Sequence, residues 1–299
     1  MRTVSEHEYT TYPRRFATYK WYKPLLVGAM FIVFLLICIT AVDLISKAAF
    51  GSIVTDTGYD DMDFFTAAGA FSNGAKAAVV IPCLILAALI VKDRPVSSYW
   101  SSMGGWRWKV FLKTIAVSFV ILGIPTIAKL LAEGRTDAMK FTLGGIIILT
   151  LLVPLQGIGE EMLFRGYLTQ TVSSWFMLPA AGIIFQILLF SLVHPYNIIG
   201  VVEIAVSALI YALVTVCSKG IEAASALHII NNISEIYMAG FGFGKITAEQ
   251  TVPSIAFNLG LKVLFFLFIL YAGKKLHWFD ELQKDDVTEY NAKHQKHPA

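Results

Sequence analysis

Two adjacent glutamates and an arginine interrupt an apolar part of this 299-residue sequence, in the segment GIGEEMLFRGYL at residues 157–168. A carboxylate that is removed from water holds a proton more readily, so it is a candidate general base. On a helix, Glu161 and Arg165 lie four residues apart and share a face, which predicts that they pair. Glu160 is rotated by about 100° from Glu161 and is therefore free to face another group.

Two more pairs of residues repeat this four-residue spacing downstream. His228 and Asn232 would share one face of a helix, and so would Phe190 and His194. Taken singly, a buried histidine is usually a hydrogen-bonded core group, and a Glu–Arg pair can simply tie helices together. Taken together, these side chains supply a base for water, an acid for a leaving amine and donors for an oxyanion, which are the groups that amide hydrolysis needs.

Composition indicates the setting of these polar groups. The chain is 56% hydrophobic and only 15% charged, whereas soluble domains are about 45–50% apolar and about 25% charged. Apolar runs long enough to cross about 30 Å of hydrocarbon recur along the sequence. We therefore expect an all-α, polytopic membrane helix bundle of about eight transmembrane helices, at about residues 24–45, 74–91, 110–131, 142–164, 178–195, 199–217, 221–240 and 253–273.

Charge predicts the orientation. Lysines and arginines favour the side of the two termini by 17 to 5, and the opposite side holds the acidic run Asp56, Asp60, Asp61 and Asp63. The positive-inside rule then predicts a multi-pass protein of the cell membrane with both termini in the cytoplasm. We expect a basic-aromatic N-terminal segment (1–23), a membrane domain (24–275) with a catalytic core at 142–240, and a cytoplasmic tail (276–299). The net charge of +3 reflects these flanks and gives no reason to expect nucleic acid.

Distance along the chain predicts the depth of the site. If a turn centres near Met177, Glu160 and His194 each lie 17 residues from it, so an antiparallel hairpin would place them at equal depth. This requires the fourth helix to continue past Arg165 toward Ser173. His228 would lie on the order of 10–15 Å from the cytoplasmic side. These depths predict a cavity that is entered from the cytoplasm.

The three motifs together resemble a known family. Glu160-Glu161-Met-Leu-Phe-Arg165-Gly fits the pattern EExxxR, Phe190-Ser-Leu-Val-His194 fits FxxxH, and His228-Ile-Ile-Asn-Asn232 fits HxxxN. Their order resembles the CAAX protease and bacteriocin-processing family (CPBP, or Abi) of intramembrane endopeptidases, related to the Ras-converting enzyme. The resemblance covers about residues 142–240.

The resemblance implies a role for each position. Glu160 and His194 would activate a water molecule, His228 and Asn232 would donate hydrogen bonds to the oxyanion, and Glu161 with Arg165 would be the supporting pair. The substrate would be a membrane-associated peptide or protein, in some relatives a prenylated CAAX protein. No cofactor is implied.

Alternatives remain at this stage. Zinc bound by Glu160, His194 and His228 is one, although no HExxH motif is present and the pattern favours a glutamate-dependent site without metal. A non-catalytic immunity or partner-binding protein is another. The four positions with implied catalytic roles are all intact, which argues against it. A transporter or proton relay is a third, but the sequence has no inverted repeat.

Overall fold

The computed structural model describes residues 8–51 and 62–294. Asp56, Asp60 and Asp61 of the acidic run lie outside the described residues, as do the first seven and last five residues of the two predicted cytoplasmic segments. Every element longer than a single bridge in the described part of the chain is a helix. The predicted all-α fold is confirmed.

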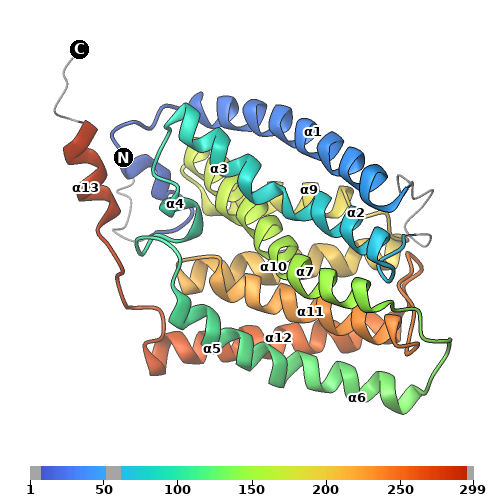
Figure 1. The fold of residues 1–299 in the computed structure, drawn as a ribbon. Coiled ribbons are helices and arrows are strands. Elements are labelled where there is room, and N and C mark those ends of the chain that lie inside the picture. The colour runs from blue at the N-terminus through green and yellow to red at the C-terminus, as the bar shows by residue number, and fades with distance from the viewer. Residues whose placement is uncertain (1–7, 52–61, 295–299) are drawn as a thin grey trace.

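The helices follow one another with short connections (Figure 1). In chain order they are α1 (Lys23–Phe50), α2 (Ala67–Ala78), α3 (Val80–Val91), α4 (Ser97–Trp100), α5 (Trp108–Ser118), α6 (Ile124–Glu133), α7 (Leu143–Glu161), α8 (Gln170–Phe176), α9 (Pro179–Leu192), α10 (Ile198–Ser218), α11 (Glu222–Gly240), α12 (Val252–Leu276) and α13 (Asp286–His294). Two π-helical segments, Phe119–Gly123 and Met162–Thr169, join α5 to α6 and α7 to α8 without a break.

Each of the eight predicted spans coincides with a helix or a continuous helical run. Among the described residues, six runs are long and apolar enough to cross a membrane: Lys23–Phe50, Ala67–Val91, Trp108–Glu133, Leu143–Phe176, Ile198–Ser218 and Val252–Leu276. The chain is therefore a multi-pass membrane protein. The count of eight is not confirmed, because α9 has only 14 residues and α11 carries several polar side chains. Whether α9 and α11 cross the membrane stays a prediction.

Local sequence signals explain where the helices of the site begin and end. Thr142 and Asn197 cap α7 and α10, since their side-chain oxygens accept hydrogen bonds from the Gly145 and Gly200 amides at 3.0 and 2.9 Å. Met177 ends α8 in the left-handed conformation (φ 53°), so the turn predicted there is confirmed. The continuous helix from Leu143 to Phe176 also meets the condition that the helix of Glu160 extend past Arg165.

Helix α11 lies inside the bundle. It contacts α5, α6, α7 and α10, and its first half is almost completely buried. The approach of α7 is close at Gly157, where a Cβ atom would lie 2.8 Å from Cγ1 of Ile229. This packing against protein explains how a helix with polar residues is accommodated, and it brings the two glutamates of α7 next to His228.

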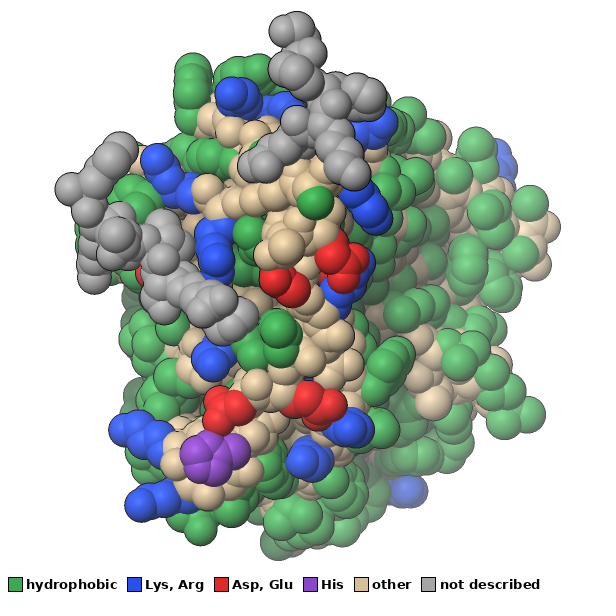
Figure 2. Space-filling model, turned by 90° about the vertical axis from the view of Figure 1, so that its left-hand side faces the viewer, with side chains coloured by type: hydrophobic (Ala, Val, Ile, Leu, Met, Phe, Trp, Pro, Cys, Tyr) green, Lys and Arg blue, Asp and Glu red, His purple; other side chains and the backbone are tan. Residues whose placement is uncertain are grey.

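The bundle has two ends (Figure 1). The terminal end carries the N-terminal segment, α4 and α13, and the distal end carries the α1–α2, α6–α7, α9–α10 and α11–α12 connections. Lysine and arginine side chains are spread over the terminal end, flanked by hydrophobic side chains (Figure 2). Leucines such as Leu36, Leu112, Leu151 and Leu188 are about 60% exposed on the helices between the ends, which suits contact with lipid.

Candidate active site

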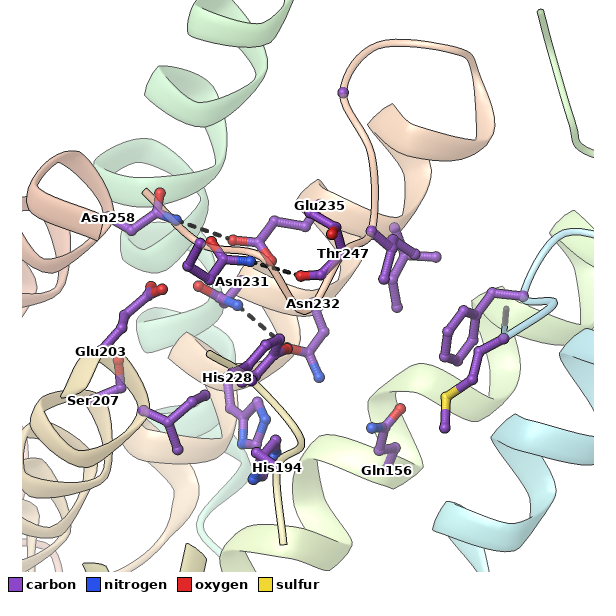
Figure 3. A pocket seen from close by; sticks show the side chains of 18 of the residues that line it. Gln156, His194, Glu203, Ser207, His228, Asn231, Asn232, Glu235, Thr247 and Asn258 are labelled. Atoms are coloured by element: carbon purple, nitrogen blue, oxygen red, sulfur yellow. Dashed lines mark hydrogen bonds between the residues drawn. The ribbon is translucent and has the colours of Figure 1, made fainter. Parts of the chain in front are cut away.

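The four residues predicted to be catalytic line one cavity. Its volume is about 790 Å³, within the range of about 300–1,000 Å³ that is usual for ligand pockets. Glu160 comes from α7, His228 and Asn232 from α11, and His194 from the α9–α10 connection. Figure 3 shows the two histidines and Asn232 among the residues that line the cavity. The structure therefore brings together residues that are up to 72 positions apart in the sequence.

His228 lies between the two glutamates. Its Nδ1 is 2.9 Å from Oε1 of Glu161, and its Nε2 is 3.7 Å from Oε2 of Glu160. A carboxylate at Nδ1 makes that nitrogen the donor and fixes the orientation of the ring. The Nε2 edge, which has no acceptor at normal hydrogen-bond distance, faces Glu160 and the cavity.

The two glutamates differ in their access to the cavity. The side chain of Glu160 is 18% exposed, whereas that of Glu161 is completely buried. Gln156, one turn earlier on α7, donates a hydrogen bond to Oε1 of Glu160 at 3.0 Å. Only Glu160 can therefore meet a substrate or water molecule in the cavity.

Glu161 and Arg165 form the expected pair. Nη1 of Arg165 is 3.0 Å from Oε1 of Glu161, and both side chains are completely buried. Arg165 also donates to the carbonyl of Ala208 at 3.1 Å, and its guanidinium packs over the rings of Phe190 and Tyr211. Glu161 does more than pair with Arg165, because the oxygen that accepts from Arg165 also accepts from His228. Glu161 thus holds the arginine and the imidazole at once.

A π-helical segment begins directly after Glu161, at Met162. The hydroxyl of Thr169 donates to the carbonyl of Phe164, five residues earlier, at 2.9 Å, which suits the wider turn. π-Helical turns are rare and occur frequently at functional sites. Nothing in the residue spacing distinguishes this segment from an ordinary α-helix.

The position of His194 differs from the expectation. Phe190 and His194 were predicted to share a helical face, but α9 ends at Leu192 and His194 lies in the turn that follows. Its Nδ1 is 2.6 Å from the carbonyl oxygen of Phe190, and its ring stacks on Tyr196. If Nδ1 donates to that carbonyl, Nε2 is left as an acceptor in the neutral ring. Pro195 directly after His194 explains why the helix cannot continue.

A second polar cluster lines the cavity farther from His228. Nζ of Lys262 (α12) is 2.9 Å from Oγ of Ser207 and 3.5 Å from Oε1 of Glu203, both on α10. Asn258, one turn before Lys262, donates to Oε1 of Glu235 on α11 at 3.3 Å. The sequence analysis assigned no role to Glu203, Lys262 or Glu235. Ionisable residues within predicted spans are the signal that identifies them.

Tyr211 is a further residue that the sequence analysis missed. Its ring is stacked on His228, with centroids 5.2 Å apart and planes 23° apart, and it lines the cavity. It belongs to none of the three motifs, and a tyrosine in an apolar helix is by itself an ordinary core residue. Because it lies over the face of the imidazole, Tyr211 restrains the tilt of the ring.

The direction of the cavity contradicts the sequence-based expectation. Residues of the α1–α2 connection (Met62, Phe64) and the α11–α12 connection (Phe243–Thr247) line it, and both connections belong to the distal end (Figure 1). Glu161 and Arg165, which lie farther toward the terminal end, are completely buried and are not among the residues that line the cavity. The prediction of entry from the end that carries the termini is therefore wrong.

In the described part of the chain, no group of three or more His, Cys, Asp or Glu side chains is placed to hold a metal ion. The zinc alternative, with Glu160, His194 and His228 as ligands, therefore has no preformed site in the described residues.

The fold and the cavity define the class of the molecule: a multi-pass helical membrane protein with a buried Glu–His site. Residues 142–234 match the family model described as Type II CAAX prenyl endopeptidase Rce1-like. This region, from the start of α7 into α11, is thus a domain of the Rce1-like family of intramembrane proteases, and the resemblance drawn from the three motifs is confirmed. No curated protein and no solved structure matches the chain.

Proposed function

We propose that this protein is a glutamate-dependent endopeptidase that hydrolyses a peptide bond of a membrane-associated peptide or protein. The observation that carries the proposal is the placement of Glu160, partly exposed to the cavity, beside a histidine whose other nitrogen is held by the buried Glu161. Membership of residues 142–234 in a protease family supports the reaction class.

Glu160 is the general base in this proposal. It takes a proton from a water molecule that Nε2 of His194 orients as an acceptor, and the water oxygen forms a bond to the carbonyl carbon of the substrate. The carbonyl oxygen becomes an oxyanion. When the tetrahedral intermediate collapses, the carbon–nitrogen bond breaks and Glu160 returns the proton to the leaving amine. The products are a carboxylic acid and an amine, with one water consumed.

His228 and Asn232 hold the oxyanion. This role requires the doubly protonated ring of His228, which donates from Nδ1 to Glu161 and presents Nε2–H to the cavity, where Glu160 is too distant, at 3.7 Å, to occupy it fully. Asn232, one turn later on the same helix, adds its amide donor. Preorganised donors of this kind are worth more in a water-poor site than in water. Arg165 acts through Glu161 and is a positioning residue.

Substrate trapping tests the proposal. The purified wild-type protein in nanodiscs should cleave peptides that Glu160→Ala binds but leaves intact, as seen by mass spectrometry of the bound and released peptides. Glu133→Ala is the matched control, because it removes an exposed glutamate of α6 that pairs with Lys129 and is not among the residues that line the cavity, and it should keep most of the turnover. Equal cleavage by wild type and Glu160→Ala would refute the proposal, and binding without cleavage by both would favour a partner-binding protein.

The charge distribution further supports location in the cell membrane with both termini in the cytoplasm. Among the described residues, lysines and arginines of the terminal end are Arg14, Arg15, Lys20, Lys23, Lys92, Arg94, Arg107, Lys109, Lys113, Lys219, Lys274, Lys275, Lys284 and Lys293. All six tryptophans lie in segments of this end as well.

A further inference from the structure

The cavity has a floor and a mouth at different depths of the bundle. Glu160, Tyr211 and His228 form the floor, and the completely buried pair Glu161 and Arg165 lies behind them. The mouth is formed by connections of the distal end, where Lys245 is exposed. A molecule that reaches Glu160 therefore enters past Lys245.

The wall between mouth and floor is polar along its length. On α11, Glu235, Asn232 and His228 line the cavity in succession. His228 and Glu235 are seven positions apart, which corresponds to a rise of about 10 Å along the helix. An extended peptide advances about 3.3 Å per residue, so about three residues of a substrate fit beside this stretch. Asn231 and Asn258 add amide groups to the same wall (Figure 3), and such groups pair with peptide N–H and C=O.

The distal end is poor in positive charge. Its connections hold Arg135, Lys140 and Lys245, and Lys47 and Lys129 lie near the ends of α1 and α6. Lys129 and Lys140 are paired with Glu133 and Asp137 at 2.8 and 2.9 Å. The terminal end carries many more lysine and arginine side chains, with acidic side chains among them (Figure 2). Charge bias of this kind sets the orientation of multi-pass proteins, with the positive end in the cytoplasm.

From these two observations we infer that the catalytic cavity opens on the non-cytoplasmic side of the membrane. Its substrate is an extended peptide segment that arrives from that side, and the cytoplasmic end of the bundle is closed by the Glu161–Arg165 pair and the helices around it. The cleavage itself rests on the proposed function, whereas the direction of the cavity does not.

Accessibility of single cysteines tests the inference. In a background without Cys38, Cys83 and Cys217, one cysteine is introduced at a time. The three positions are Lys245→Cys at the mouth, Ser254→Cys where the first turn of α12 lines the cavity, and Glu281→Cys at the exposed connection before α13. Intact cells that express each full chain are treated with a small charged methanethiosulfonate, which does not cross the membrane, and labelling is repeated after permeabilisation.

We expect Lys245→Cys and Ser254→Cys to react in intact cells, and Glu281→Cys to react only after permeabilisation. Reaction of Glu281→Cys but not Lys245→Cys in intact cells would overturn the orientation. Reaction of Lys245→Cys but not Ser254→Cys from outside would overturn the direction of the cavity.

A second measurement concerns the substrate. A membrane-impermeant, internally quenched peptide that the purified protein cleaves is supplied to right-side-out and to inverted membrane vesicles. Cleavage in right-side-out vesicles only is expected, and cleavage in inverted vesicles only would overturn the inference. The labelling result requires no activity, so a failure of the proposed peptidase function and a failure of the inferred direction are distinguishable.

Discussion

Removal of Arg165 is expected to destabilise the protein strongly. Arg165→Ala leaves the completely buried carboxylate of Glu161 without its cation. Loss of one partner from a buried ion pair costs about 3–5 kcal/mol. His228 still donates to Glu161, so we expect a value near the lower limit, about 3 kcal/mol. Since 1 kcal/mol shifts the melting temperature by about 2–4 °C in a chain of 150–250 residues, the expected loss is about 6–12 °C.

Thermal unfolding in detergent measures this effect, at a fixed scan rate for all variants. Lys109→Ala is the matched control, because Lys109 pairs with Glu281 at 3.2 Å but is 76% exposed, and exposed pairs contribute about 0–1 kcal/mol. The double variant Glu161→Gln/Arg165→Met removes both charges and should be more stable than Arg165→Ala. A melting temperature of Arg165→Ala equal to that of Lys109→Ala would refute the buried-pair reasoning.

Three further changes give distinct results. Asn232→Ala removes one oxyanion donor and should slow peptide cleavage by about 10²–10³-fold without changing the melting temperature; an unchanged rate would remove Asn232 from the site. Lys262→Met leaves Glu203 unpaired beside the cavity and should lower the melting temperature, whereas Glu203→Gln/Lys262→Met should recover most of it; a double variant no more stable than the single one would argue against the pair. Gly157→Val places side-chain atoms where even a Cβ would lie 2.8 Å from Ile229, so it should separate α7 from α11 and reduce cleavage more than binding. Cleavage at the wild-type rate would show that the close packing of α7 on α11 is not needed.

Periodicity and spacing were sufficient for the broad architecture. Apolar runs located helices at all eight predicted positions, and the four-residue spacing of Glu161 and Arg165 correctly predicted their pairing. Both are local properties, because a helix and its i to i+4 contacts depend on residues close together in sequence. The four residues predicted to be catalytic could also be named from the sequence, because each belongs to a motif of only a few consecutive positions.

Tertiary packing determined what the sequence did not predict. The contact of His228 with Glu161 depends on the close approach at Gly157, and no local spacing encodes which helix packs there. The early end of α9 was missed although Pro195 signalled it. The predicted direction of the cavity was wrong, because depth counted from the turns says nothing about which end of the bundle is filled by side chains such as Arg165.

The most direct test of the account is the rate of peptide cleavage by Glu160→Gln compared with wild type, measured with and without a strong zinc chelator. An amide cannot accept the proton of water, so the account predicts a loss of about 10²–10⁴-fold or more with an unchanged melting temperature, and no effect of the chelator on wild type. Wild-type turnover by Glu160→Gln would contradict the assignment of the base, and activity that vanishes on chelation and returns with zinc would establish a metal-dependent site instead.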